Sequence, residues 1–170
     1  MNKNYNLIFS ATMKLKNTYK SLFFIIFGII LISCSNEEEV PSDSPFVYLQ
    51  DRFGGTSATM DSEARFTATY TVYLSSKVRT NNLTVDYKIS TGDGLTEGLD
   101  YTLSDSEDLS LVFEPGVYEQ SLSINWLPNK LDYSKDNTLT IELISVSDPD
   151  VTIGRVGPNK LGSKYVIKKD

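Results

Sequence analysis

The chain has 170 residues, a net charge of −6, no histidine and a single cysteine, Cys34. The acidic balance argues against nucleic acid as a partner, because phosphate backbones attract basic proteins. Without histidine or a second cysteine, the sequence lacks Ser-His-Asp and Cys-His nucleophiles and ordinary zinc sites. We therefore expect a non-catalytic protein without a cofactor. Carboxylate pairs of the glycosidase type are the remaining catalytic option, but the acidic clusters fall in predicted turns.

Residues 1–33 have the pattern of a secretory signal peptide. Four lysines precede an apolar run from Leu22 to Ile32, which has the length of a signal-peptide core and is short for a membrane-spanning helix. Met13 is a possible true start, because it leaves a short basic segment before this run. Cleavage after residue 33 would remove all four lysines and make the mature chain more acidic.

The run Leu31-Ile32-Ser33-Cys34 resembles a bacterial lipobox. The resemblance implies that diacylglycerol is attached to the Cys34 thiol, and that an acyl chain is added to the new N-terminus. More than one long chain makes attachment to a membrane durable. We therefore expect a lipoprotein whose mature form begins at Cys34.

Residues 34–45 are predicted to be a tether. It contains an acidic triplet and then Pro41-Ser42-Asp43-Ser44-Pro45, which is typical of a flexible or polyproline spacer. The triplet is either a solvated linker or, by resemblance to surface lipoproteins of the Bacteroidetes, an export signal made of Glu37, Glu38 and Glu39. The second interpretation predicts a lipid-anchored protein of the outer membrane that faces the cell exterior.

Residues 46–170 predict one all-β domain. Apolar and polar residues alternate with period two, β-branched and aromatic residues are frequent, and turn signals separate the runs. We predict seven strands and no helix, with the strands at 46–49, 65–74, 83–89, 109–113, 122–126, 139–143 and 165–167. This spacing favours a two-sheet antiparallel sandwich over a barrel. Packing alone must stabilise the domain, because no disulfide can form within it.

The aromatic residues divide between the two faces of these strands. Trp126 shares a face with Leu122 and Ile124, so we predict a core position, with a sugar-stacking platform as the alternative. Tyr70 and Tyr87 are predicted to point inward. Three tyrosines that could receive a ligand if they cluster are predicted to be exposed, namely Tyr73, Tyr118 and Tyr133.

Four motifs follow one another in the second half of the chain: Gly98-Leu99-Asp100-Tyr101-Thr102, Leu111-Val112-Phe113-Glu114-Pro115-Gly116, Leu122-Ser123-Ile124, and the strand from Asp136 to Leu143. Together they resemble the Calx-beta domain, and the strand order matches that family over roughly residues 46–167. The resemblance implies an immunoglobulin-like sandwich. Many members of the family bind calcium through acidic loops at one end.

The calcium site implied by the resemblance is only partly present. Asp100 matches a family ligand, but Pro128-Asn129-Lys130 stands where an acidic pair is expected, and Lys168-Lys169-Asp170 replaces a run of aspartates. Calcium needs six to eight oxygen ligands, and a lysine adds repulsion besides removing one. We therefore predict no metal site, and a structural hydrogen-bonding role for Asp100. A different calcium site could still be built from Asp132, Asp136 and Asp150.

The leading functional expectation is a non-catalytic binding or accessory module, held at the cell surface by lipid, with an unknown protein or glycan as partner. One alternative is a glycan-binding protein of a polysaccharide uptake system, which requires two or more coplanar aromatic rings on an exposed face. The other alternative is a calcium-dependent adhesion module.

Overall fold

The structure, a computed structural model, describes residues 44–104 and 109–170. Within these residues the chain forms ten strands and no helix, so no described helix could cross a membrane. The strands are β1 (Phe46–Leu49), β2 (Ser57–Met60), β3 (Phe66–Ser75), β4 (Leu83–Thr91), β5 (Tyr101–Leu103), β6 (Ser110–Phe113), β7 (Glu119–Trp126), β8 (Thr138–Val146), β9 (Thr152–Ile153) and β10 (Lys164–Lys169).

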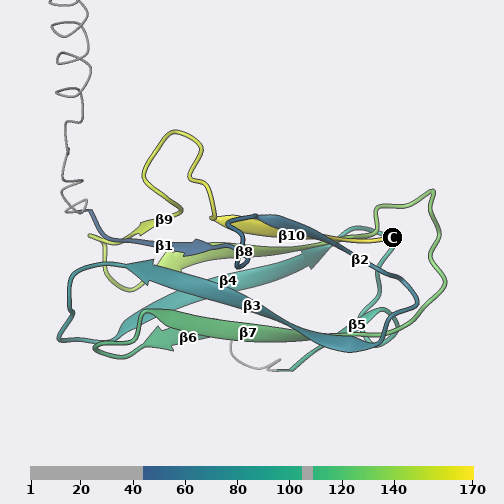
Figure 1. Ribbon diagram of the computed structural model, residues 1–170, viewed down its shortest axis with the longest axis horizontal. Coiled ribbons are helices and arrows are strands. Elements are labelled where there is room, and N and C mark those ends of the chain that lie inside the picture. The colour runs from purple at the N-terminus through teal and green to yellow at the C-terminus, as the bar shows by residue number, and fades with distance from the viewer. Residues whose placement is uncertain (1–43, 105–108) are drawn as a thin grey trace, which may run out of the picture. The chain divides into compact units, whose positions relative to one another are not determined.

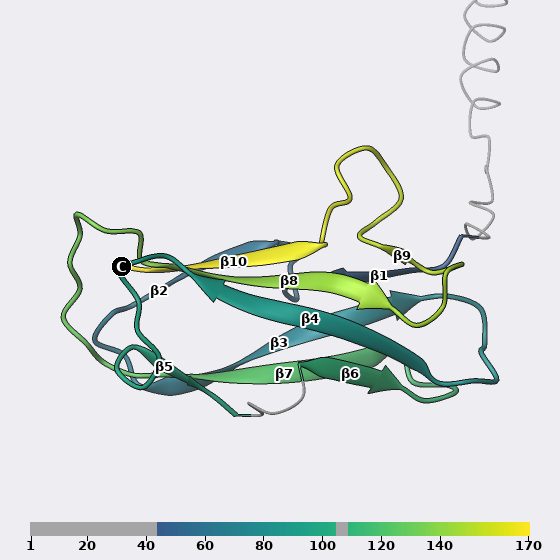
Figure 2. The same cartoon turned by 180° about the vertical axis from the view of Figure 1, so that it is seen from behind.

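The strands form two layered sheets. The first sheet has the order β5-β7-β3-β1-β9, and the second has the order β2-β10-β8-β4-β6. The first sheet lies nearer the viewer in Figure 1, and the second lies nearer in Figure 2. The predicted all-β, two-sheet sandwich is confirmed.

The predicted strands are all present, but the description needs two corrections. Three short strands, β2, β5 and β9, were not predicted. β5 and β9 have only three and two residues, and β2, with the sequence Ser57-Ala58-Thr59-Met60, lacks the consecutive large apolar residues that identify the four-residue strands β1 and β6. The pairing is also not wholly antiparallel, since β1 with β9 and β2 with β10 are parallel. Both parallel pairs involve the N-terminal segment, which contributes β1 to the first sheet and β2 to the second.

The inner faces of both sheets form the core. Trp126 is 1 % exposed, and its indole N–H donates to the Tyr70 hydroxyl at 3.2 Å. Tyr70 and Tyr87 are buried and Tyr133 is exposed, as predicted, whereas Tyr73 and Tyr118 are only half-buried. Phe66 begins β3 on the predicted apolar face but is exposed, because it lies at the end of the strand where the sheets no longer cover it.

The outer faces of the two sheets differ in chemistry. On the second sheet, Glu142 accepts ion-pair contacts from Lys88 at 2.7 Å and Lys164 at 2.9 Å. The first sheet instead carries cross-strand pairs of neutral groups, which are Thr67 with Asn125, Thr69 with Ser123, and Thr71 with Ser121.

Candidate ligand-binding site

The site begins where β1 leaves the first sheet. β1 pairs with β3 from Phe46 opposite Ser75 to Leu49 opposite Val72, and the chain then crosses through residues 50–56 to become β2 of the second sheet. β3 itself starts six residues earlier, at Phe66, and pairs with β7 along its other side from Phe66 to Tyr73. One side of β3 therefore lacks a strand partner over residues 66–71.

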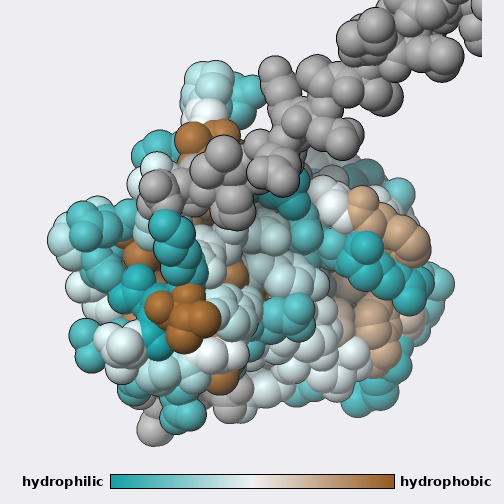
Figure 3. Space-filling model, turned by 60° about the vertical axis from the view of Figure 1, so that its left-hand side comes forward, coloured by the Kyte–Doolittle hydropathy of each residue, from teal (hydrophilic) through white to brown (hydrophobic). Residues whose placement is uncertain are grey.

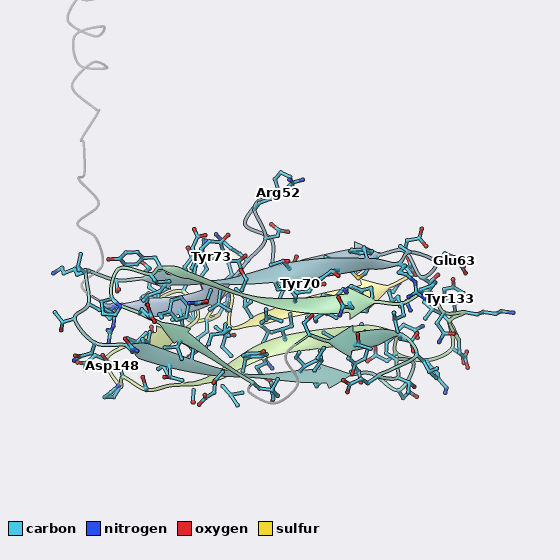
Figure 4. All side chains as sticks on the ribbon, turned by 90° about the horizontal axis from the view of Figure 1, so that it is seen from below. Arg52, Glu63, Tyr70, Tyr73, Tyr133 and Asp148 are labelled. Carbon is cyan, nitrogen blue, oxygen red and sulfur yellow. The ribbon has the colours of Figure 1, made fainter. Side chains whose placement is uncertain are left out.

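A tight turn at residues 51–55 stands beside this open edge. The Asp51 carboxylate accepts hydrogen bonds from the amides of Phe53 and Gly55, both at 2.8 Å, and these bonds lower the pKa of Asp51, the Gly55 amide having the larger effect. Gly54 has a φ of +84°, a conformation that favours glycine. The turn therefore holds Arg52 clear of the sheet, with Tyr73 and Tyr70 labelled beneath it in Figure 4.

A hollow of about 320 Å³ lies between this turn and β3, at the small end of the range for ligand cavities. Its walls are formed by Gln50, Asp51 and Arg52 from the loop, and by Thr69, Thr71 and Tyr73 from β3. The buried tyrosines Tyr70 and Tyr165 line its base, with ring centroids 5.5 Å apart.

The two base tyrosines are neutral hydrogen-bonding groups near pH 7. Burial raises the pKa of Tyr70 to about 12 and also raises the pKa of Tyr165. The Tyr165 hydroxyl donates to Asp51 Oδ2 at 3.4 Å, which joins the base to the turn. The hollow is thus lined by hydroxyls, an amide and one charge of each sign, and the Asp51 carboxylate is already occupied by backbone amides.

An aromatic cluster flanks the hollow on the outer face. The rings of Tyr48 and Tyr73 are stacked, with centroids 5.4 Å apart and planes 24° apart, and the Arg155 guanidinium lies 4.8 Å from the Tyr48 centroid. Arg155 also donates to the side chain of Gln50. These rings stack on one another, which differs from the coplanar arrangement that a sugar platform requires.

Asp100 lies at another place in the fold, at the start of β5. It is 1 % exposed, and its carboxylate accepts hydrogen bonds from the Thr96 amide at 2.8 Å, Lys169 Nζ at 3.0 Å and Asn129 Nδ2 at 3.1 Å. Lys169 is also 1 % exposed and donates to the carbonyl of Leu127 at 2.7 Å. Asp100 is therefore a structural acceptor, as predicted, and an ammonium group lies against its carboxylate.

The other candidate acidic residues do not converge with Asp100. Asp132 and Asp136 each accept a hydrogen bond from an amide two residues further on, and Asp150 is exposed in a turn that Asp148 caps. Within the described residues, no three or more Asp, Glu or Cys side chains are grouped to hold a metal ion. The predicted lipidation residue Cys34 and the triplet Glu37, Glu38 and Glu39 lie outside the described part.

Most of the hollow was not anticipated from the sequence. Tyr73 was predicted to be available to a ligand, but Gln50, Arg52, Thr69 and Arg155 were not singled out. The local signal was Asp51 followed by Gly54 and Gly55, a turn pattern that marks a stop after the first strand. Nothing local shows that the chain changes sheets at this turn, and it is this change that creates the hollow.

The fold and the site together define a two-sheet β-sandwich with a candidate ligand hollow beside an open strand edge. No family model matches the chain, and no curated protein does. Among solved structures, one that is similar is the crystal structure of a protein of unknown function from Bacteroides ovatus, with 15 % identity and a TM-score of 0.47. The match covers 72 % of this chain and 43 % of that one, so this chain spans less than half the length of that protein.

Proposed function

We propose that this protein is a non-catalytic lipoprotein of the outer membrane whose β-sandwich domain binds a ligand at the hollow beside β3. The observation that carries the proposal is the hollow itself, which gathers hydroxyls, an amide and a guanidinium at an open strand edge. Its one carboxylate, Asp51, is held by two backbone amides. These groups suit binding better than acid and base chemistry.

The sequence supports the anchored part of the proposal. Cys34 ends the lipobox-like run, and the acidic triplet resembles the export signal of Bacteroidetes surface lipoproteins. Eleven residues, 35–45, separate Cys34 from β1, and a chain of that length reaches at most about 40 Å. The domain would therefore remain close to the membrane surface and capture ligands there.

We also propose that the domain is Calx-beta-like. The turn at Pro115-Gly116, where Gly116 has a φ of +85°, and the buried Asp100 give structural roles to two of the motifs that resemble the family. The Lys169 ammonium lies against Asp100, which makes the calcium-dependent adhesion module the weaker alternative.

The anchoring is tested in cells by labelled palmitate, membrane fractionation and protease shaving. The native chain is expected to incorporate palmitate, to fractionate with the outer membrane and to be shaved from intact cells. Cys34→Ala should lose both label and membrane attachment, whereas Ser42→Ala, in the same tether, should lose neither. Replacing Glu37, Glu38 and Glu39 with alanine should keep the label but protect the protein from the protease. A Cys34→Ala variant that stays in the membrane fraction would overturn the proposal.

A glycan is the second candidate ligand. The neutral pairs on the outer face of the first sheet favour it, since Asn125 extends them toward Thr102 and Ser104 of the β5 region, at 3.4 Å each. Affinity gels containing neutral polysaccharides test this function. Tyr73→Ala should reduce retention, and Tyr133→Ala is the matched control, because Tyr133 is exposed on the loop between β7 and β8, away from the hollow.

A further inference from the structure

Each residue of β3 directs its backbone N–H and C=O groups either toward β7 or toward the opposite side of the strand. The Leu74 amide donates to the Tyr118 carbonyl on the β7 side at 2.8 Å. Because backbone groups in an antiparallel strand alternate from side to side, Tyr70 and Val72 also bond toward β7. The groups of Thr67, Thr69, Thr71 and Tyr73 therefore point to the opposite side.

The same alternation is visible in β1. The Leu49 amide donates to the Gly162 carbonyl, and the Val47 carbonyl accepts from the Gly154 amide, so both residues bond away from β3. β1 consequently bonds to β3 through Phe46 and Tyr48, which face Ser75 and Tyr73. The ladder ends where Leu49 lies opposite Val72, which leaves Gln50 beside the Thr71 carbonyl. Before Thr71, β3 has no partner strand on this side.

Thr67, Thr69 and the amide of Thr71 thus face the space that β1 has left. Within residues 44–104 and 109–170, no strand pairs with this side of Thr67 and Thr69, and no loop carbonyl accepts from the amides of Thr67, Thr69 and Thr71. Thr69 and Thr71 line the hollow. The unpaired stretch is about 14 Å long at the rise of a β-strand, which suits an extended segment of about five residues.

We propose that the hollow binds an extended peptide segment of a partner protein, which pairs with Thr67, Thr69 and Thr71 of β3 as an added strand. This inference rests on the proposed function and names the ligand class for the same site. Strand addition to an open edge supplies affinity through backbone bonds and selectivity through alternate side chains. A peptide side chain that points inward would pack on Tyr70 and Tyr165, and Arg52 stands at the mouth.

The arrangement favours a peptide over a sugar for two reasons. The unpaired N–H and C=O groups recur at every second residue, and an extended peptide has the same repeat. The ring of Tyr48 is already covered by Arg155 and stacked on Tyr73, so the pair does not offer the flat surface on which sugars stack.

The test uses the full-length lipidated protein in detergent micelles, against a phage-displayed library of random dodecapeptides. Binders are then measured by calorimetry and by amide hydrogen exchange. In the free protein, the amides of Thr69 and Thr71 should exchange quickly, whereas those of Tyr70 and Val72 should be protected. A bound peptide should slow exchange at Thr69 and Thr71 and leave Tyr70 and Val72 unchanged.

Two variants separate backbone pairing from side-chain recognition. Thr69→Pro removes the amide that points to the open edge, together with the hydroxyl beside Ser123, and should weaken peptide binding at least about tenfold. Thr69→Val keeps this amide and loses the hydroxyl, and should bind the peptide as the native chain does. Because proline could disturb the strand, the same selected peptides are also tested with N-methyl groups at alternate residues, and one of the two methylated series should lose binding at least about tenfold.

Three outcomes would overturn the inference: a library that yields no binder protected at Thr69 and Thr71, equal binding by native and Thr69→Pro protein, and methylated peptides that bind as well as the parent. If a polysaccharide binds instead, is lost in Tyr73→Ala and is weakened by Thr69→Val, the ligand hollow stands and the peptide assignment fails. Concentration-dependent protection of Thr69 and Thr71 without added peptide would identify a second copy of this chain as the occupant, which also contradicts the assignment.

Discussion

At the residue scale, the pair of Asp100 and Lys169 is the most consequential polar contact of the interior. Both side chains are almost fully buried, and the lysine also bonds to the Leu127 carbonyl. Breaking such a pair leaves an unpaired buried charge, which costs more than the intact pair contributes. The pair joins the last strand, β10, to the beginning of β5.

Lys169→Met should therefore lower the free energy of unfolding by about 3 kcal/mol or more. Lys168→Met is the matched control, because the Lys168 side chain is 56 % exposed and pairs with Asp170 at the surface, where such pairs contribute about 1 kcal/mol or less. Urea denaturation measures both. A double variant, Asp100→Asn with Lys169→Met, should recover part of the loss, and equal losses in the two single lysine variants would contradict the role given to the buried pair.

The same pair predicts a dependence of stability on pH. Burial opposes ionisation of Asp100, but the hydrogen bonds from Thr96, Lys169 and Asn129 outweigh it, so the pKa in the folded state lies below the ordinary value of 3.8. Because the pKa of Asp100 is lower in the folded state than in the unfolded state, ionisation of Asp100 stabilises the fold. This stabilisation is complete above the ordinary pKa and is lost as the pH falls through the pKa of the folded state. The difference in unfolding free energy between the native chain and Asp100→Asn should therefore be constant near neutrality and narrow below about pH 4.

This pH dependence is measured by urea denaturation of both proteins at a series of pH values. Other aspartates with lowered pKa, such as Asp51 and Asp148, lose stabilisation in the same direction in both proteins. The comparison with Asp100→Asn removes their contribution. A difference that stays constant down to pH 2 would show that Asp100 is not held in its ionised form by the fold.

At the element scale, the turn at residues 51–55 decides whether the hollow keeps its shape. Asp51→Ala removes the acceptor for the Phe53 and Gly55 amides and the contact with Tyr165. Amide exchange at Phe53 and Gly55 should accelerate, and ligand affinity at the hollow should fall. Asp61→Ala is the control, since Asp61 caps the next turn through the Glu63 amide alone, and it should leave the hollow unchanged. Slow exchange at Gly55 in Asp51→Ala would show that the turn is held by other contacts.

The elements also show what could be predicted from the sequence. Strands such as β3, β7 and β8 span eight to ten residues, so their alternation identified both their existence and their buried faces, including that of Trp126. The hollow depends on where β1 stops pairing with β3, and residues 49 and 72 are far apart in the chain. Likewise, Asp100 and Lys169 are 69 positions apart in the sequence, and only the fold brings the Lys169 ammonium onto the Asp100 carboxylate.

At the scale of the whole molecule, the outer faces of the two sheets carry different side chains. The second sheet carries the two ion pairs of Glu142, whereas the first carries the neutral cross-strand pairs, the exposed Glu119 at the start of β7, and the hollow. On the side shown in Figure 3, apolar atoms form separate patches among hydrophilic ones.

Calcium should not change the stability of the whole domain. A ligand that binds only the folded state at 100 times its dissociation constant adds about 2.7 kcal/mol of stability, so thermal melts detect even modest binding. Melts in millimolar calcium and in chelator should coincide, because a lysine ammonium lies against the Asp100 carboxylate and no three acidic side chains of the described residues are grouped to hold a metal ion. Lys168→Met, which leaves the buried pair intact, should behave in the same way. A higher melting temperature in calcium would revive the adhesion module as a function.

The early departure of β1 from the first sheet has a mechanical consequence. With Cys34 held in a membrane and a ligand held along the open edge of β3, tension between them would run lengthwise through β1. This strand is bonded to β3 on one side and to β9 on the other, so its hydrogen bonds would carry a shearing load together and would not unzip one after another. The strand β1, whose early end leaves room for a ligand beside β3, would then also transmit the pulling force from a bound ligand to the cell envelope.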